Sequence, residues 1–324
     1  MAKQTQWSFP ANLQPDPADV RFDLDAALDA VVMLRSEVPE DAFTAGILGT
    51  ERIGNGVVIR ADGLILTIGY LTTEASAIWL TTNSGQVMAG HPLAYDQATG
   101  FSLVMPLGKL DIAPLTRGTT ASAMVGDDVF FVSHGGREHA LRAKVVAKRE
   151  FAGYWEYVLD EAIFTAPAHP QWGGAALVGE NGRLLGIGSL LVQEALQGQE
   201  VQGNMVVPID LLAPILEDLL TTGQGRRPPR PWLGMYVTEF KGQLVVGGLA
   251  DEGPAERAGV KLGDIVAEVA GECVGGLAPM FRRIWSLGAA GADIPLALVR
   301  DRKRMELKVR SADRADFLKK PQLH

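Results

Sequence analysis

The sequence predicts a mainly β protein in which a β sandwich or a pair of β barrels is followed by a smaller α+β domain. Short runs rich in Val, Ile and Leu, separated by turn residues, extend from residue 55 to about residue 190. A stiff segment rich in Pro and Arg follows near residue 226, and helical and extended patterns alternate after it. The length of 324 residues fits two domains, with room for a third small one.

Composition and charge exclude several classes of protein. Hydrophobic residues make up 47% of the chain and charged residues 21%, which excludes a mainly disordered or collagen-like chain. Thirty basic residues against 38 acidic ones give a net charge of −8. Because such a chain has no general attraction for phosphate backbones or anionic lipid, we expect neither nucleic acid nor a membrane among its partners.

Cys273 is the one cysteine, which excludes an internal disulfide and every multi-cysteine metal site. We expect it to be a small buried apolar residue.

The N-terminus contains no apolar run of the ~7 to 15 residues that a signal peptide needs. No stretch approaches the ~20 apolar residues of a membrane span. These features predict a cytoplasmic location.

The first 29 residues are expected to form an arm and a short helix. Residues 1–20 are rich in Pro and Gln, and residues 22–28 carry a weak helical pattern. The apolar run at residues 31–34 is the expected first strand. It opens a β domain that we assign to residues 30–222.

Turn residues at 61–63, 83–85 and 180–182 separate the expected strands of this domain. The alternation ends at residues 208–220, where apolar residues recur at helical spacing and Gly223 follows. The sequence therefore predicts a helix at the end of the β domain.

Residues 223–231 read as a linker, residues 232–313 as the α+β domain and residues 314–324 as a tail. Within the α+β domain we expect two helices and a hairpin. One helix has Pro in its first turn and Gly just past its end, and the other has one apolar face. These elements cover residues 253–259 for the first helix, 277–287 for the second, and 294–299 with 305–309 for the hairpin.

Several motifs resemble those of the HtrA-type (DegP-like) serine proteases. Residues 54–59 and 62–67 resemble the opening of the trypsin-like barrel of that family, and four later segments resemble its PLVN, DG, GIN and AIP motifs in the same order. The C-terminal motifs resemble its PDZ domain, where residues 253–266 match the GSPAxxAGLxxGDxI pattern. The later barrel segments are residues 176–178, 181–182, 186–188 and 206–209. The resemblance implies a trypsin-like double β-barrel followed by an α+β PDZ domain.

The three positions of the family's catalytic triad carry other residues here. Such enzymes use a serine deprotonated by a histidine that a carboxylate orients. The resemblance places Tyr70 at the base, Gly100 at the carboxylate and Gly173 at the nucleophile. In the oxyanion loop, Gln171 replaces a glycine and Trp172 adds a large ring. The resemblance therefore implies a catalytically inactive member, a pseudoprotease with no cofactor and no metal, that is not an enzyme.

The expected function is then binding, as an adaptor, scaffold or chaperone-like protein. In a PDZ domain a peptide adds a strand to the sheet and its C-terminal carboxylate binds the backbone N–H groups of a loop. The resemblance assigns that loop to Trp232, Leu233, Gly234 and Met235, and the strand to Met235, Tyr236 and Val237. The helix that receives the last side chain of the peptide includes Phe281 and Ile284. The alternative is an interdomain packing module with an occluded groove.

Two other functions remain as alternatives. An active hydrolase would use a non-standard site, such as His169 or His134 with Ser102 or Ser189, and a zinc site would use His134, His139 and Glu138. We expect these histidines to be turn or surface residues. A small ligand could instead occupy the former cleft, lined by Tyr70, Trp172, Tyr154 and Trp155, although these rings are expected to fill the core.

The arm carries Trp7 and Phe9 among polar residues. Members of the family form trimers through aromatic residues in the corresponding arm. The resemblance therefore implies a homotrimer.

Overall fold

The computed structural model describes residues 7–196 and 199–320. The chain folds into two compact units. The first unit comprises residues 1–149, 161–225 and 319–324, and the second comprises Glu150–Asp160 and residues 226–318. The division between residues 225 and 226 falls in the segment that the sequence marks as a linker. Glu150–Asp160, however, lie within the segment that the sequence assigns to the β domain.

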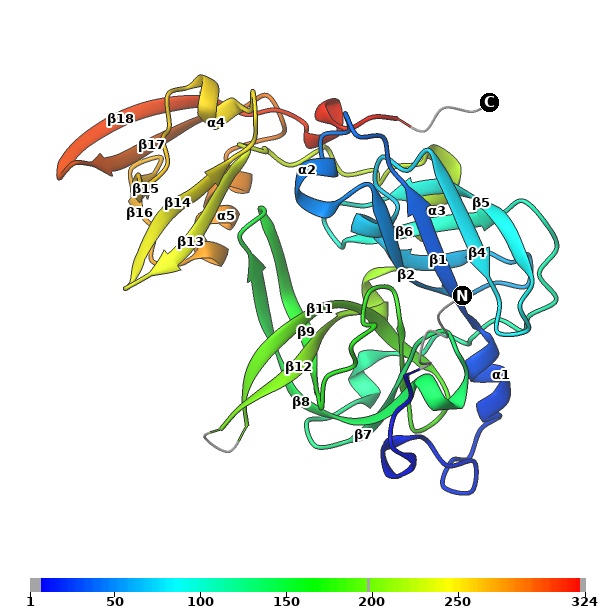
Figure 1. The fold of residues 1–324 in the computed structure, drawn as a ribbon. Helices are drawn as coiled ribbons and strands as arrows, with labels where there is room; N and C mark the ends of the chain where they lie inside the picture. Colours follow the sequence, from blue (N-terminus) through cyan, green and yellow to red (C-terminus); the bar gives the residue numbers. More distant parts are fainter. Residues whose placement is uncertain (1–6, 197–198, 321–324) are drawn as a thin grey trace. The chain divides into compact units, whose positions relative to one another are not determined.

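The first unit contains two closed antiparallel barrels (Figure 1). In the first barrel the strands are ordered β1-β2-β3-β6-β5-β4. Its interior is filled by side chains that alternate along these strands, including the fully buried Leu34, Leu66 and Phe101. The strands are β1 (Val31–Glu37), β2 (Glu51–Val58), β3 (Ile65–Ile68), β4 (Ala77–Thr81), β5 (Val87–Tyr95) and β6 (Phe101–Pro106).

In the second barrel the order is β10-β11-β12-β9-β8-β7. Phe131, Leu141, Ile163 and Leu177 belong to its buried core. The strands are β7 (Asp128–Val132), β8 (Ala140–Gly153), β9 (Tyr157–Ala166), β10 (Ala176–Gly179), β11 (Leu184–Leu196) and β12 (Gln199–Pro208). The turn end of the long β8–β9 hairpin is the segment Glu150–Asp160 that belongs to the second unit.

Short helices precede, connect and follow the strands of the first unit. The Asp23 carboxylate caps α1 by accepting a hydrogen bond from the Ala26 N–H at 3.0 Å. The helix predicted over residues 208–220 is broken into η5 and α3, and α3 ends at Gly223, whose φ of 71° is left-handed. These elements are η1 (Ala11–Leu13), α1 (Leu24–Asp29), α2 (Ala45–Leu48), η2 (Gly69–Leu71), η3 (Thr120–Ser122), η4 (Arg137–His139), η5 (Ile209–Leu211) and α3 (Leu216–Thr222).

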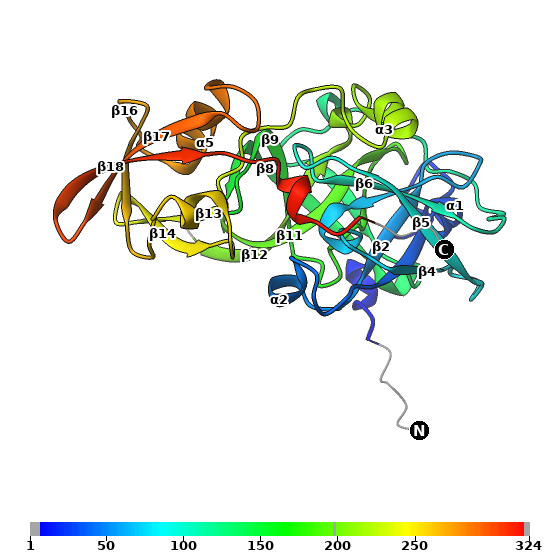
Figure 2. The same ribbon diagram turned by 90° about the horizontal axis from the view of Figure 1, so that it is seen from above.

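The second unit is a six-stranded sheet with two helices. Its strand order is β13-β14-β15-β17-β18, with β16 paired to β15. Strands β13, β14, β16, β17 and β18 and helix α5 can be followed in Figure 2. Helix α5 buries Ala278, Met280, Phe281 and Ile284 against the sheet. The elements are β13 (Met235–Phe240), β14 (Gln243–Leu249), α4 (Pro254–Arg257), β15 (Ile265–Val269), β16 (Glu272–Cys273), α5 (Leu277–Ser286), β17 (Asp293–Arg300), β18 (Lys303–Arg310) and η6 (Arg314–Phe317).

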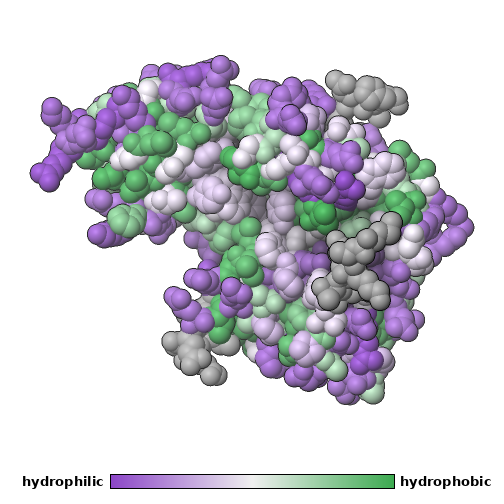
Figure 3. All heavy atoms as spheres, in the orientation of Figure 1, coloured by the Kyte–Doolittle hydropathy of each residue, from purple (hydrophilic) through white to green (hydrophobic). Residues whose placement is uncertain are grey.

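The predicted fold class is confirmed: the chain is mainly β, with a double barrel followed by an α+β domain. The tip of the β17–β18 hairpin carries the exposed residues Asp301, Arg302 and Lys303, and it is hydrophilic in Figure 3.

Cys273 is exposed, so its predicted burial is wrong: it lies on the two-residue strand β16 at the side of the sheet. Among the described residues, no helix has the length and apolar character needed to cross a bilayer.

Candidate functional sites

The structure gathers the three triad positions in the first unit. Tyr70 lies in η2 directly after β3, and Gly100 lies in the turn before β6. The Gly69 N–H donates to the Gly100 carbonyl at 2.7 Å, which joins the first two segments. A Cβ atom placed on Gly173 would lie 2.7 Å from the Tyr70 hydroxyl, which brings in the third. The structure therefore brings together the three positions that the resemblance assigns to a triad, and these positions hold a phenol and two glycines.

Tyr70 acts there as a hydrogen-bond donor. Its hydroxyl donates to the Ser189 carbonyl at 2.9 Å and is also hydrogen bonded to Trp172. Burial raises the pKa of Tyr70 above its ordinary value of 10, although the bond to Trp172 opposes this shift. A phenol held neutral in this way cannot take a proton from a nucleophile at neutral pH.

Asn55 fixes the segment that would carry the nucleophile. Its backbone N–H donates to the Gly173 carbonyl at 2.8 Å, and its side-chain amide donates to the carbonyls of Gln171 and Gly173 at 3.0 and 3.1 Å. The Asn55 side-chain oxygen in turn accepts a bond from the His134 N–H at 2.9 Å. This buried amide therefore ties strand β2 of the first barrel to two loops of the second.

In the loop that the resemblance assigns to an oxyanion hole, the Gln171 N–H already has a hydrogen-bond acceptor. The Gln171 N–H donates to His169 Nδ1 at 3.0 Å, and His169 Nε2 lies 2.8 Å from the His139 carbonyl. Burial lowers the pKa of His169 to about 4, so the ring is neutral at pH 7, with its proton on Nε2. An oxyanion hole needs N–H groups directed at the reacting oxygen, and the N–H of Gln171 is already used.

The alternative arrangements of serine and histidine are not assembled. Ser102 Oγ donates to the Ala94 carbonyl and accepts from Thr72 Oγ1, while His134 Nε2 lies 3.2 Å from the Thr82 carbonyl. Within residues 7–196 and 199–320, no serine hydroxyl is hydrogen bonded to a histidine ring, and no group of three or more His, Cys, Asp or Glu side chains is placed to hold a metal ion. These histidines were expected to be turn or surface residues: His139 lies in the short helix η4, but both His139 and His169 are buried, so surface exposure is wrong for these two.

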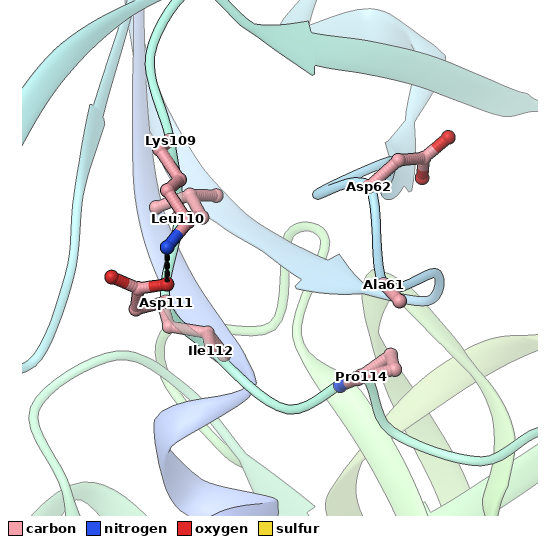
Figure 4. Close-up of a pocket in the computed structure, with 7 residues that line it drawn as sticks. All are labelled: Ala61, Asp62, Lys109, Leu110, Asp111, Ile112 and Pro114. Carbon is pink, nitrogen blue, oxygen red and sulfur yellow. Dashed lines mark ion pairs between the residues drawn. The ribbon is translucent and has the colours of Figure 1, made fainter.

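A shallow pocket lies elsewhere on the first unit (Figure 4). The Lys109 ammonium lies 2.6 Å from the Asp111 carboxylate, and both side chains are at least 80% exposed. Such an exposed pair is screened by water and has little binding power of its own. The lining residues include none of the triad positions: they are Ala61, Asp62, Lys109, Leu110, Asp111, Ile112 and Pro114.

In the second unit the predicted carboxylate-binding loop already binds a carboxylate, that of Glu156. Glu156 Oε1 accepts hydrogen bonds from the backbone N–H groups of Leu233 at 3.1 Å, Gly234 at 2.7 Å and Met235 at 3.2 Å. The Leu233 N–H also lies 3.1 Å from Oε2. Three consecutive amides thus converge on one anion, which is the arrangement of a backbone anion nest.

The backbone of residues 232–235 is shaped for this purpose. Gly234 has a φ of 68°, and a Cβ atom on it would lie 2.9 Å from Ala250 Cβ and 3.0 Å from the Trp232 ring. The Leu233 and Gly234 carbonyls accept bonds from Ala255 and Ala250 on the opposite side, both at 2.8 Å. In a peptide unit the N–H points away from the carbonyl. Because the Leu233 and Gly234 carbonyls are bonded on one side, the N–H groups of Gly234 and Met235 point to the other side, toward Glu156.

Glu156 is deeply buried, with 5% of its surface exposed. Burial raises the pKa of Glu156 to about 7, while the three backbone donors and the nearby Arg314 oppose that shift. Its backbone has a left-handed φ of 63°, at the turn of the β8–β9 hairpin. Sequence reasoning missed this residue, although an acidic residue flanked by aromatic residues at positions 154, 155 and 157 is an unusual hairpin turn.

The rest of the hairpin turn packs on the predicted peptide groove. Val158 belongs to the same buried cluster as Val237, Phe281 and Ile284, and the Tyr154 ring lies 6.1 Å from the Tyr236 ring. Tyr154 and Trp155 therefore belong to this turn and do not line the former cleft. Among the described strands, β13 pairs with β14 alone. The hairpin turn therefore lies against residues that the sequence assigned to a peptide groove.

Comparisons with known proteins agree with this architecture. The model of the trypsin-like peptidase domain matches residues 54–187. A probable periplasmic serine endoprotease of the DegP-like type from Halomonas elongata is 23% identical over 280 residues, 82% of this chain and 58% of the relative. A protein of the same name from Pseudomonas fluorescens is 25% identical over 272 residues, 80% of this chain and 56% of the relative. The chain spans little more than half the length of these relatives.

Solved structures show the same fold. The HtrA-type protease AlgW with tripeptide superposes with a TM-score of 0.52 at 18% identity, covering 93% of this chain and 99% of that one. The serine endoprotease from Yersinia pestis gives 0.53 at 20% identity, covering 91% of this chain and 99% of that one.

These matches correct two expectations drawn from the sequence. The expectation that the chain is not an enzyme is contradicted, because the relatives and the structural neighbours are named proteases. The cytoplasmic location is likewise contradicted, because the DegP-like relatives are named periplasmic. Residues 54–187 thus match a trypsin-like peptidase domain, and the chain as a whole is similar in sequence and fold to HtrA-type and DegP-like serine proteases.

Proposed function

We propose that this member of the HtrA-type family binds the C-terminal carboxylates of peptides or proteins through residues 232–235, in the manner of a PDZ domain, and acts as an adaptor, scaffold or chaperone-like protein. The observation that carries the proposal is the convergence of the Leu233, Gly234 and Met235 N–H groups on a single carboxylate. Hydrogen bonds to a charged acceptor are about twice as strong as neutral ones, so such a loop discriminates a carboxylate from an amide.

The surroundings of the loop support a peptide as the ligand. Strand β13 has an edge that no described strand pairs with, which is where an extended peptide adds to a sheet. Phe281 and Ile284 lie on α5 in the same apolar cluster as Met235 and Val237, and such a cluster suits the last side chain of a peptide. AlgW, one of the structural neighbours, is described with a bound tripeptide.

Hydrolysis is a second candidate function, favoured by the protease names of the relatives. Residues 70, 100 and 173 supply no base, carboxylate or nucleophile, so hydrolysis would use other groups. Labelling with a fluorophosphonate probe, followed by peptide mapping, tests this candidate. A single labelled serine whose replacement abolishes cleavage of casein would support it, and the absence of labelling would reject a serine mechanism.

The carboxylate preference tests the first candidate. Fluorescent decapeptides of mixed sequence ending in Val, Leu or Phe are titrated onto the full chain as free acids and as amides. A charge-assisted hydrogen bond contributes about 1.5–3 kcal/mol, so the free acids should bind at least about tenfold more tightly. Equal binding of acids and amides, both by the wild type and by Glu156→Ala, in which the Glu156 carboxylate is removed from the loop, would overturn the proposal.

A pair of glycine variants provides the matched control. Gly234→Ala places a methyl group against Ala250 and Trp232 and should abolish the preference for the free acid. Gly242→Ala has a similar φ of 73° in the β13–β14 turn, but its Cβ would meet nothing within 4 Å. This second variant should keep the preference.

A further inference from the structure

The carboxylate held by the loop of residues 232–235 belongs to the chain itself. Glu156 enters from the turn of the β8–β9 hairpin and precedes the loop by 77 residues at its first contact, Leu233. All the residues of this contact lie in the second unit. The hairpin turn is therefore an internal ligand at the site where the proposed function places a peptide C-terminus.

The geometry leaves no donor of this loop for a second carboxylate. Leu233 donates to both oxygens of Glu156, while Gly234 and Met235 both donate to Oε1. Glu156 is only 5% exposed, so the side chain fills the nest instead of lying over it. A peptide carboxylate can reach these three N–H groups only after that of Glu156 has left.

The turn also covers the apolar part of the groove. Val158 is 7% exposed within the cluster that contains Phe281 and Ile284, and Ala152 packs against the same cluster. A peptide side chain bound to these residues would displace part of the turn. The hairpin turn thus makes both kinds of contact that the proposed peptide would make: a carboxylate in the loop and an apolar side chain in the groove.

The docked turn carries features that favour its release. Glu156 has a left-handed φ of 63°, which costs a residue with a Cβ atom some conformational energy. Burial raises the pKa of Glu156 to about 7, so the backbone donors do not fully compensate the carboxylate for its lost hydration. The ion pairs of Arg282 with Glu150 and Asp160 are largely exposed and add little to docking.

From these contacts we propose that Glu156 is an intramolecular competitor for the carboxylate-binding loop, and that a free-acid peptide binds by displacing the β8–β9 turn. This proposal rests on the proposed function and adds its regulation. The apparent affinity of the full chain is then the intrinsic affinity of the loop multiplied by the fraction of molecules in which the turn is undocked. Binding of a peptide therefore frees residues 150–160 from the groove.

The free-acid decapeptides are titrated onto the wild type, Glu156→Ala and the control Glu180→Ala. Glu180 is an exposed residue of the β10–β11 turn in the first unit. Glu156→Ala should bind the free acids at least about tenfold more tightly than the wild type, and Glu180→Ala should bind them as the wild type does. Amidated peptides should bind weakly to all three.

The outcomes separate the two proposals. Equal free-acid affinity of the wild type and Glu156→Ala would overturn the competition but leave carboxylate binding standing. No free-acid preference in any of the three proteins would overturn carboxylate binding itself, and with it the competition.

Hydrogen exchange on the wild type tests displacement without any variant. At saturating free-acid peptide, the backbone amides of residues 150–160 should exchange faster than in the free protein, while those of β14 and β15 should not. Unchanged or slower exchange of residues 150–160 at saturation would show that the peptide binds with the turn still docked, which would overturn the proposal.

Discussion

Tyr70 and Gly173 share one small space, and each limits what can stand at the other position. A Cβ atom on Gly173 would lie 2.7 Å from the Tyr70 hydroxyl, which is itself bonded to the Ser189 carbonyl. The Tyr70 side chain thus occupies the room that a side chain at residue 173 would need. Restoring one triad residue alone does not restore the geometry of a triad.

Gly173→Ser should therefore destabilise the protein. The new side chain must displace the Tyr70 hydroxyl and leave the Ser189 carbonyl without its donor, which costs about 1–3 kcal/mol. Urea unfolding measures the loss. Gly46→Ser is the control, because a Cβ on Gly46 meets nothing within 4 Å. An equal loss for both variants would show that the Tyr70 contact does not matter.

Glu156 makes stability depend on pH, with a defined sign. Its pKa in the folded protein is about 7 against an ordinary 4.5, so the folded state binds the proton more tightly than the unfolded chain. Its contribution is fully present below pH 4.5 and is lost as the pH rises through 7. The side chains coupled to the carboxylate are Arg314, which lowers this pKa, and Tyr236, whose own pKa is raised above its ordinary value by burial.

The free energy of unfolding of the wild type should accordingly fall, relative to Glu156→Gln, by about 2–3 kcal/mol between pH 4.5 and 8. Urea unfolding of both proteins at the two pH values measures the difference. A difference that does not change with pH would contradict the raised pKa.

At the scale of elements, the β8–β9 hairpin is held by apolar packing more than by charge. Val158 is buried among residues of β13 and α5, whereas Arg282 and its partners Glu150 and Asp160 are between 43% and 93% exposed. Burial of a side chain such as Val contributes about 1.5–3 kcal/mol, and an exposed ion pair contributes about 0–1 kcal/mol.

Val158→Ala should therefore expose residues 150–160 to hydrogen exchange much more than Arg282→Gln does. Mass spectrometry of the exchanged peptides measures both variants against the wild type. Faster exchange in Arg282→Gln than in Val158→Ala would show that the ion pairs hold the hairpin more strongly than the apolar packing does.

The elements that were predictable from sequence are those with strong local signals. Helix α5 follows from the apolar spacing of residues 277–287, and the β17–β18 hairpin follows from two apolar runs around a polar turn. Residues 208–220 had the helical spacing as well, but the structure turns this segment into two short pieces. Local periodicity does not determine such a break, because packing against the barrel decides it.

In the candidate sites, likewise, the residues marked by local motifs could be predicted and the long-range contact could not. The motifs placed Tyr70, Gly100 and Gly173 in three separate segments, and the structure brings these segments together. The motif at residues 232–235 likewise indicated a loop of N–H donors. Glu156 was not predictable, because its bond to Gly234 spans 78 residues and no local pattern encodes that contact.

At the scale of the whole molecule, the assembly state stays a prediction. Within one chain, Trp7 stacks on His139 with ring centroids 4.5 Å apart, and Phe9 lies 5.0 Å from His169. The trimer expected from the family resemblance would have to use this aromatic cluster or the surface around it.

Light scattering at micromolar concentration should then give three times the chain mass of 34.7 kDa. The double variant Trp7→Ala and Phe9→Ala should reduce that mass to one chain. A single-chain mass for the wild type would reject the trimer.

The most direct test of the account observes the amides of Leu233, Gly234 and Met235 by nuclear magnetic resonance in the full chain. Glu156→Ala should move all three amide proton resonances upfield, because each loses a carboxylate acceptor. Free-acid decapeptide added to this variant should return them toward their wild-type positions, and amidated decapeptide should not. Amide resonances that shift neither in Glu156→Ala nor on addition of the free acid would contradict the claim that this loop binds carboxylates and that Glu156 is its internal ligand.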